Sequence, residues 1–361
     1  MAEPNAADRK RILGFDGLRA ISALLVFCEH KLTRYTVGLL GVWIFFTLSG
    51  YLICGILHDA ALAPQPASHG RWRALLEFWR HRALRIFPIY YLTLAVLFAI
   101  TPLVGAKELV IYSAYLQNFY IAFVSHSWTP ITHFWSLAIE QQFYVCVAPL
   151  LLWLAPERHR LGIGWLFGVC LAAVVACEIF AWDPMAVSLL PTTNFAFIAL
   201  GGLLRLSPSG ASLRLKLASP AAFVLSGLGL ATSFVVLSHP ENPESGTPFL
   251  VFLFGLIFCG ALVARVVESQ DSLGVRILEK WPLTALGRIS YGFYIYHALL
   301  PNQAQVLSAL FGAEAHVGVP KLLWAALELT VSILLASASW VWIERPFLAL
   351  KRPLPVRSAS A

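Results

Sequence analysis

The sequence predicts an all-α fold, a polytopic membrane helical bundle with about 10 transmembrane helices plus a short interfacial or re-entrant segment. Composition is the first observation behind this prediction, because 58% of the 361 residues are hydrophobic and only 12% are charged, whereas a soluble domain carries about 25% charged residues. The mean hydropathy of +0.72 is the second. The third is a series of apolar runs of about 18–22 residues, the length of a membrane-spanning helix.

The apolar runs give the candidate spans, and the basic residues give their orientation. The runs cover 17–37, 39–57, 86–104, 134–155, 161–180, 185–204, 218–237, 249–267, 284–311 and 321–343. Cytoplasmic loops are rich in Lys and Arg, and a cytoplasmic N-terminus places 22 of the 26 basic residues on that side. The stretch 109–124 is short and dotted with polar residues, and a full crossing there would invert the later basic loops. We therefore expect it at the outer interface and both termini in the cytoplasm.

This topology predicts one membrane domain between two short tails. Residues 1–12 form a cytoplasmic N-terminal tail, 13–345 an integral membrane domain, and 346–361 a cytoplasmic C-terminal tail. The net charge of +7 is explained by the orientation of the loops, so no nucleic-acid partner is expected, and the lipid bilayer is the first partner. All six cysteines fall in apolar runs, which favours packing roles over disulfides or a metal site.

Arg19 and His30, both in the first apolar run, form the first candidate site. Ionisable side chains are costly in hydrocarbon and mark function there. Eleven residues correspond to about three helical turns plus 20°, so the two side chains point the same way, roughly 16 Å apart along the axis. Asp16 is expected to be the N-cap of a helix that begins at Gly17. Glu29, about 100° around the helix from His30, is expected to pair with a cation on a neighbouring helix.

A structural alternative exists for both residues of this pair. Arg19 would then be an anchor at the cytoplasmic surface, and His30 a hydrogen-bonded packing residue.

The segment "RHRALRIFP" carries the second candidate site, Arg82 and Arg85. Residues three apart lie on one helical face, and two guanidiniums on one face can clamp a phosphate. The alternative is that these arginines only orient the protein in the membrane.

The segment "HFWSLAIEQQFY" carries the third candidate site, near the predicted outer surface. Glu140 is a candidate catalytic carboxylate, and its polar and aromatic neighbours suit a polyhydroxylated acceptor. A fourth segment, "GRISYGFYIYHALLPNQ", adds His297 and Asn302. The structural alternative is an aromatic belt with a polar cluster. The predicted acceptor-binding residues are Trp135, Ser136, Gln142, Tyr144 and His297.

Six segments of the chain occur in an order that resembles the acyltransferase type 3 family. They are "GFDGLRAISALLVFCEH", "GVWIFFTLSGYLI", "FWRHRALRIFPIYYL", "WSLAIEQQFY", "LGRISYGFYIYH" and "IERPF", and together they cover essentially the whole chain. The family's motif of Arg, ten residues and His falls on Arg19 and His30, and its Arg-x-x-Arg motif on Arg82 and Arg85. Relatives commonly have a second acid where this chain has Gln141, which leaves Glu140 as the only carboxylate of that pair.

The resemblance implies an O-acyltransferase of a bacterial inner (cytoplasmic) membrane that uses acetyl-CoA as donor and a saccharide as acceptor. Arg19, Arg82 and Arg85 would bind the phosphates of acyl-CoA, and no cofactor would be bound permanently. His30 would be either a general base or a nucleophile that carries the acyl group. Another acyl donor such as succinyl-CoA, the identity of the saccharide and the oligomeric state stay open.

A hypothesis from another class is a transporter or flippase with a proton relay through His30, Glu140 and His297. The sequence has no internal repeat and no matched pair of broken helices, which are typical of secondary transporters. A non-catalytic membrane scaffold is the third reading, and it gives no reason for a buried Glu-His pair.

Overall fold

Every secondary-structure element in the described part of the chain is helical, as predicted. The computed structural model describes residues 11–33, 37–63, 70–100, 104–208, 210–237, 248–300 and 320–351. Seven helical segments there are long and apolar enough to cross a membrane, or eight if a bent pair is one span. The seven are Val37–Leu62, Gly70–Ile100, Thr132–Trp153, Pro156–Ile179, Pro184–Leu206, Phe249–Glu268 and Lys321–Ala349.

The bent pair consists of α10 (Ser212–Ala218) and α11 (Pro220–Leu237), whose axes differ by 59°. The bend lies at Ser219, whose ψ of 144° is extended. A residue that precedes proline is pushed out of the helical region, and Pro220 then provides the fixed φ that suits a first helical turn. The sequence Ser-Pro therefore accounts for the break.

The prediction of about ten spans is only partly matched. The first predicted span is α1 (Phe15–Lys31), whose 17 residues extend about 26 Å. The predicted span 284–311 begins as two short helices, α14 (Trp281–Arg288) and α15 (Ser290–Tyr296). Its second half, with Asn302, lies outside the described residues, as do most of both predicted tails.

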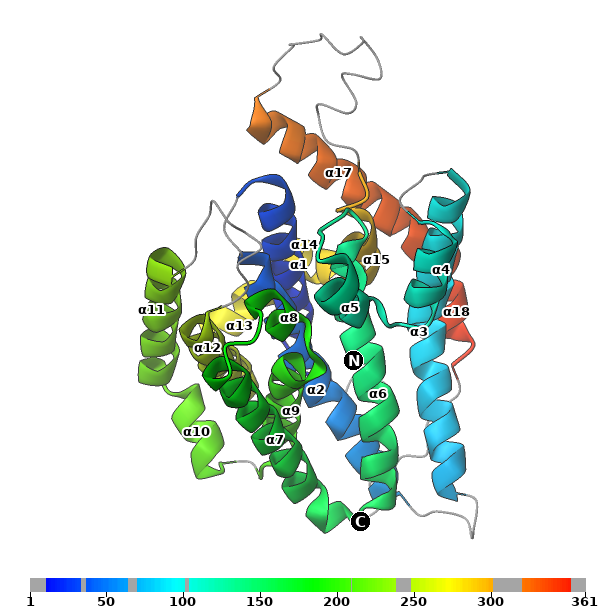
Figure 1. Cartoon of the computed structure of the whole chain (residues 1–361). Coiled ribbons are helices and arrows are strands. Elements are labelled where there is room, and N and C mark those ends of the chain that lie inside the picture. The colour runs from blue at the N-terminus through cyan, green and yellow to red at the C-terminus, as the bar shows by residue number, and fades with distance from the viewer. Residues whose placement is uncertain are drawn as a thin grey trace, which may run out of the picture.

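The stretch 109–124 does not form one spanning helix, in agreement with the prediction. It is divided among α4 (Ala106–Ser113), α5 (Gln117–Tyr120) and a π-helical turn at Ile121–Ser125. In Figure 1, α4 and α5 lie near the upper end of α6 (Trp135–Trp153).

The long helices form a bundle with α2 (Val37–Leu62) and α6 in its interior. Figure 1 shows α11 at one edge and α3 (Gly70–Ile100) at the other. Of the most apolar stretch of α2, 67% is buried inside the protein, against 17% for the segment that contains α7 (His159–Ile179). The remaining helices are α8 (Pro184–Leu189), α9 (Pro191–Leu206), α12 (Phe249–Glu268), α13 (Leu273–Leu278), α17 (Lys321–Ser339) and α18 (Arg345–Ala349).

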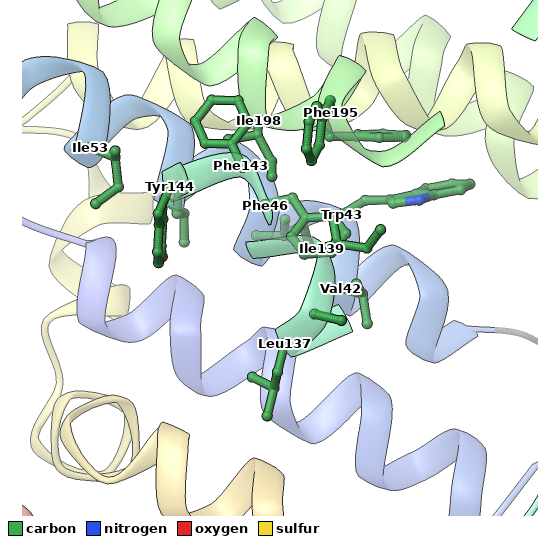
Figure 2. Packing of buried hydrophobic residues seen from close by; sticks show 14 of the residues in the cluster. Val42, Trp43, Phe46, Ile53, Leu137, Ile139, Phe143, Tyr144, Phe195 and Ile198 are labelled. Carbon is green, nitrogen blue, oxygen red and sulfur yellow. The ribbon is translucent and has the colours of Figure 1, made fainter. Parts of the chain in front are cut away.

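Aromatic packing on α2 holds the interior of the bundle together (Figure 2). Trp43 stacks on Phe197 of α9, with ring centroids 4.5 Å apart, and meets the ring of Phe252 of α12 edge-on at 6.5 Å. Phe143 of α6 meets Phe195 of α9 edge-on at 5.2 Å. Each such pair contributes about 0.5–1.5 kcal/mol beyond the area that it buries. These contacts hold α9 and α12 against α2, and α6 against α9.

The first helix begins earlier than predicted, and Asp16 is not its N-cap. The N-cap residue is Gly14, whose φ of +89° is left-handed and which has no side chain to cap with. Asp16 lies in the first turn and accepts hydrogen bonds from Arg11 (3.3 Å) and Arg19 (2.9 Å). A carboxylate in the first turn interacts favourably with the positive end of the helix dipole. Two guanidiniums therefore engage the side chain that was expected to cap the helix.

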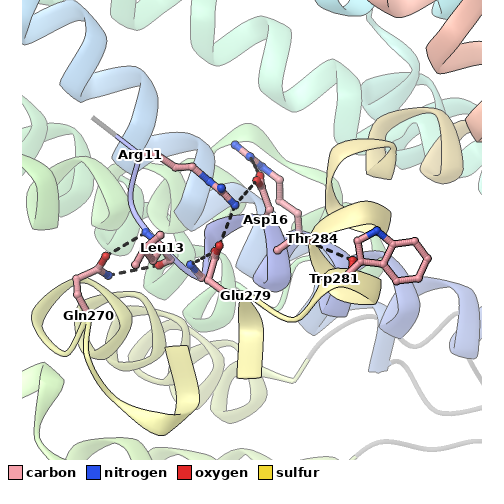
Figure 3. A network of polar contacts seen from close by, with 9 residues as sticks. Arg11, Leu13, Asp16, Gln270, Glu279, Trp281 and Thr284 are labelled. Atoms are coloured by element: carbon pink, nitrogen blue, oxygen red, sulfur yellow. Dashed lines mark hydrogen bonds and ion pairs between the residues drawn. The ribbon is translucent and has the colours of Figure 1, made fainter. Parts of the chain in front are cut away.

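A network of polar contacts joins the start of α1 to the segment before α14 (Figure 3). The Glu279 carboxylate accepts from the Gly14 N–H at 2.6 Å and from Arg11 at 2.9 Å. The Leu13 N–H donates to Gln270 at 3.0 Å. These bonds satisfy backbone donors that a helix start leaves free.

The backbone of α1 also touches the backbone of α13 and of α14. A Cβ added at Gly17 would lie 2.2 Å from the Leu278 carbonyl oxygen, and one added at Gly287 would lie 2.0 Å from that of Asp16. Any side chain at either position would therefore force α1 away from its neighbours.

Gly17→Ala is expected to lower the free energy of unfolding by about 1–3 kcal/mol, because the clashing atom belongs to the backbone and cannot rotate away. The matched control is Gly168→Ala in α7, where an added Cβ meets no atom within 4 Å. That change is expected to be neutral or to stabilise by about 0.5–1 kcal/mol. Thermal unfolding of the detergent-purified proteins measures both, and equal stability of the two variants would contradict the close packing.

Candidate active site

A small cavity of about 100 Å³ brings the three predicted arginines together. Arg19 comes from α1, and Arg82 and Arg85 come from one face of α3. Arg19 forms an ion pair with Asp16 at 2.9 Å. Within the described residues, no carboxylate forms an ion pair with Arg82 or Arg85. This arginine cavity therefore carries two guanidiniums without a paired anion.

Glu140 lies in the arginine cavity rather than beside His30. Its carboxylate accepts a hydrogen bond from Ser49 at 2.5 Å, and Tyr144 lines the same cavity. The Arg82 guanidinium lies 5.7 Å from the ring centroid of Phe78 and 6.0 Å from that of Tyr144. Glu140 and Arg82 thus line the same cavity, with Tyr144 as a common neighbour in its wall.

Lys351 is a further cation close to the arginine cavity. Burial, together with the charges of Arg82 and Arg85, lowers the pKa of Lys351 to about 7. Arg80 of α3 donates to the Leu350 carbonyl at 2.9 Å, which holds the end of α18 against α3. Lys351 follows α18, the last helix. Because it lies far from Arg82 and Arg85 in the sequence, the sequence gave no indication that these residues are close in the structure.

A larger cavity of about 500 Å³ contains His30, and its volume lies in the usual range of small-molecule sites. His30 and Glu29 come from α1, and His133 comes from the 3-10 turn Thr132–Phe134. The side chain of His30 is open to this histidine cavity. Other lining residues include Trp128, Trp135, Thr129, Thr132, Met185 and Ser188.

His297 contacts His30 directly, which the sequence did not predict. Nδ1 of His30 and Nε2 of His297 are 2.8 Å apart, and the two rings are nearly parallel with centroids 5.0 Å apart. His133 completes the cluster, with its ring centroid 6.2 Å from that of His30 and 5.3 Å from that of His297. His297 is fully buried and lines neither cavity. His297 therefore lies behind His30, away from the walls of the two cavities.

Tyr294 of α15 and Val42 of α2 line both cavities. The Tyr294 hydroxyl donates to the His133 carbonyl at 2.8 Å and lies 2.6 Å from the Ser136 hydroxyl. The arginine cavity and the histidine cavity are thus neighbours that share one wall.

The other predicted acceptor-binding residues do not form one site. Trp135 lines the histidine cavity, whereas Ser136 and Tyr144 line the arginine cavity. Gln142 lines neither, and its amide donates to the Tyr115 carbonyl and to Asn118, both at 2.8 Å. Gln142 therefore connects α6 to the α4–α5 segment.

Among the residues that the structure describes, Glu29 does not form the expected ion pair with a cation. Its carboxylate accepts from the Gly38 N–H at 2.6 Å, in the first turn of α2. A carboxylate at that position satisfies a free backbone donor and faces the positive end of the helix dipole. Glu29 thus caps α2 from the neighbouring helix.

Lys31 supplies the ion pair at this end of α1. Its ammonium lies 2.6 Å from the Glu328 carboxylate of α17 and 3.2 Å from the Leu300 carbonyl. The side chains of Lys31 and Glu328 are 9% and 6% exposed. The pair joins α1 to α17 beside the histidine cavity.

Among the site residues that were absent from the sequence predictions are His133, Ser49 and Trp128. His133 is the first residue of the segment "HFWSLAIEQQFY", and Ser49 lies in "GVWIFFTLSGYLI", so both stand in segments that carried the family resemblance. Trp128 lies in the outer loop segment "SHSWTP". An aromatic residue in a predicted outer loop gives little signal, because Trp is common at membrane interfaces.

A family model described as "Acyltransferase domain" (Acyl_transf_3) matches residues 12–343. The chain belongs to the acyltransferase type 3 family. This membership and the seven apolar helices identify a helical membrane protein. The match includes every residue of the arginine and histidine cavities.

Relatives of this acyltransferase 3 chain are named as O-acetyltransferases. It is 26% identical to "O-acetyltransferase OatA" of Staphylococcus aureus over 359 residues, which cover 92% of this chain and 56% of OatA. It is 29% identical to "Putative peptidoglycan O-acetyltransferase YrhL" of Bacillus subtilis over 362 residues, which cover 93% of this chain and 54% of YrhL. The chain spans about half the length of these curated relatives. No solved structure matches it.

Lys31→Met is expected to lower the free energy of unfolding by about 3–5 kcal/mol, because it leaves the Glu328 carboxylate buried without its partner. The double variant Lys31→Met with Glu328→Leu is expected to recover most of that loss. Thermal or denaturant unfolding of the native protein, the two single variants and the double variant provides the test. A double variant that loses the sum of both single losses would show that the two side chains are not coupled.

Proposed function

We propose that this chain is a membrane O-acyltransferase that moves an acetyl group from cytoplasmic acyl-CoA to a saccharide hydroxyl across the membrane. The observation that carries this proposal is that α1 presents Arg19 to the arginine cavity and His30 to the histidine cavity. Eleven residues of helix separate them by roughly 16 Å. The names of the relatives OatA and YrhL support an O-acetyltransferase.

The arginine cavity would bind the phosphates of acyl-CoA. Arg82 and Arg85 have no paired carboxylate in the described part of the chain, and paired guanidiniums suit bidentate phosphate contacts. A cavity of about 100 Å³ is smaller than a typical ligand site, so it would hold only a part of the donor. The acyl arm would extend past Tyr294 towards His30.

His30 would perform the transfer through Nε2 by one of two routes. As a general base, it would take the proton of the acceptor hydroxyl while that oxygen attacks the thioester carbonyl. The carbon–sulfur bond would break, and the CoA thiolate would recover the proton. As a nucleophile, Nε2 would attack the carbonyl itself, and the CoA thiolate would leave. The acceptor oxygen would then attack the acyl-imidazole, restore His30 and release its proton. In the second route the acyl group would cross the membrane without CoA crossing it.

The histidine cavity would receive the acceptor. Trp128 and Trp135 offer apolar ring faces, and Thr129, Thr132 and Ser188 offer hydroxyls, a combination that suits a sugar with alternating polar and apolar edges. The name of YrhL supports a cell-wall saccharide such as peptidoglycan as the acceptor.

Acetyl is the favoured acyl group. A succinyl donor would bring a second carboxylate that needs a cation near the transfer point. Lys31, next to His30, is already paired with Glu328, and Arg34 lies outside the described residues.

The proposed orientation places the arginine cavity at the cytoplasmic face of a bacterial inner membrane, with ten crossings and both termini in the cytoplasm. The count of basic residues supports this orientation.

A transporter with a relay through His30, Glu140 and His297 is the rival function. Glu140 lines a different cavity from His30 and is hydrogen-bonded to Ser49, which does not support a continuous relay. Binding of acetyl-CoA to the purified protein discriminates between the two functions, because a sugar transporter has no need of it.

His30→Ala is expected to lower acetyl transfer at least 100-fold, because it removes the only group proposed to act as base or nucleophile. The assay incubates purified protein with labelled acetyl-CoA and cell-wall glycans and follows labelled product. His126→Asn is the matched control, since His126 is an exposed loop residue with a φ of +46° that Asn tolerates. Native activity in His30→Ala would refute the proposed function.

Arg82→Ala and Arg85→Ala are each expected to raise KM for acetyl-CoA about 10–100-fold with little change in kcat, because each removes a charge-assisted phosphate contact. Arg73→Ala is the control, since Arg73 is an exposed arginine of the same helix. A fall in kcat without a change in KM would instead assign these arginines to the chemical step.

A further inference from the structure

We propose that His297 is a positioning residue that fixes the tautomer of His30 and thereby makes Nε2 of His30 the reactive nitrogen. This inference rests on the proposed function, in which His30 performs the transfer. The inference is based on the hydrogen-bond partners of the His30 and His297 rings. If both rings are neutral, these partners allow only one assignment of the N–H hydrogens.

The first step concerns the proton on His297. Nδ1 of His297 lies 2.8 Å from the Tyr294 carbonyl oxygen and 3.3 Å from that of Phe293. A carbonyl oxygen only accepts hydrogen bonds, so Nδ1 of His297 must carry the hydrogen. These carbonyls belong to the last turn of α15, where the negative end of the helix dipole favours a donor.

The second step concerns the proton on His30. A neutral imidazole carries one N–H and one lone pair, so Nε2 of His297 accepts. Its partner at 2.8 Å, Nδ1 of His30, must then donate. The lone pair of His30 is consequently on Nε2, to which no described residue forms a hydrogen bond. Because the side chain is open to the histidine cavity, this lone pair is available to an acyl group or a hydroxyl.

Packing keeps His297 in this orientation. The ring is fully buried, lies nearly parallel to the ring of Phe293 at 5.9 Å and is 5.6 Å from the ring of Tyr294. A half-turn about its terminal torsion would put ring carbons where the two nitrogens now lie and break the hydrogen bonds of both.

His133 cannot take over this role. Both of its ring nitrogens face backbone carbonyls, Nδ1 that of Pro130 at 2.7 Å and Nε2 that of Ile295 at 3.2 Å. His133 therefore forms part of the wall, and neither of its nitrogens is hydrogen-bonded to His30.

The same bond would also support the charged intermediate. When Nε2 of His30 gains a proton or an acyl group, the ring becomes positive while Nδ1 keeps its hydrogen. The bond from Nδ1 to His297 is then charge-assisted and stronger. His297 thus stabilises the state that follows the first chemical step without itself exchanging a proton.

The test compares His297→Leu with His297→Gln. Leu removes the acceptor, and we expect kcat to fall roughly 10²–10⁴-fold with an unchanged KM for acetyl-CoA, since a mispositioned or wrongly protonated catalytic histidine costs up to about 10⁴-fold. Gln returns an acceptor oxygen near the position of Nε2, and we expect kcat within about tenfold of native. His159→Leu is the matched control, because His159 forms a histidine pair with His58 at 3.0 Å outside both cavities.

Nitrogen NMR of histidine-labelled native protein reads the tautomer directly, with the His30 signals assigned by their loss in His30→Ala. An unprotonated Nε2 in the native protein, which changes in His297→Leu, supports the proposal. A protonated Nε2, native kcat in His297→Leu, or equal losses in the Leu and Gln variants would overturn it. If His297→Leu no longer binds acetyl-CoA, its kcat is not informative. The kcat of His297→Gln and the tautomer of His30 in the native protein then test the proposal.

The same experiments separate this inference from the proposed function. Activity in His30→Ala refutes the function itself. An inactive His30→Ala together with a fully active His297→Leu refutes only the positioning role.

Discussion

The close seating of α1 against α13 and α14 determines the geometry of the whole site. Gly17 and Gly287 allow backbone contact at the start of this helix. Because a helix is a nearly rigid rod that rises 1.5 Å per residue, a fixed start also fixes the position of His30. At the other end the Lys31–Glu328 pair and the Glu29 contact to α2 hold α1 in place. The spacing between the two cavities is therefore a property of one clamped helix.

Some charged side chains of the interior have a partner within the part of the protein that the structure describes, whereas others lack an ion-pair partner there. Lys31 has its carboxylate, and Glu29 has a backbone donor, so these charges are satisfied within the fold. Arg82 and Arg85 lie in the arginine cavity without an ion-pair partner in the described residues. A buried cation without an anion is costly. It persists where a ligand supplies the missing charge, and a phosphate meets that requirement.

Sequence periodicity predicted directions around a single helix but not contacts between helices. The common face of Arg19 and His30 follows from the helical repeat, and each lines its own cavity. The contact between His30 and His297 joins residues 267 positions apart, and no local pattern encodes how α1 is rotated against α15. Glu140 was placed with the outer cluster for the same reason, since its direction depends on the packing of α6. Asp16 is a good N-cap by type, but two arginines compete for it.

The short helix α15 connects the proposed donor site to the proposed catalytic histidine. Ser290 and Tyr291 in its first turn line the arginine cavity, and Tyr294 in its second turn lines both cavities. The carbonyls of that turn then hold Nδ1 of His297, which contacts His30. A donor that displaced α15 on binding would therefore change the wall between the cavities and the orientation of His30 together. Within two turns, α15 lines the arginine cavity, forms the wall that both cavities share and holds His297. The nitrogen proposed to react therefore depends on the same helix that would meet the donor.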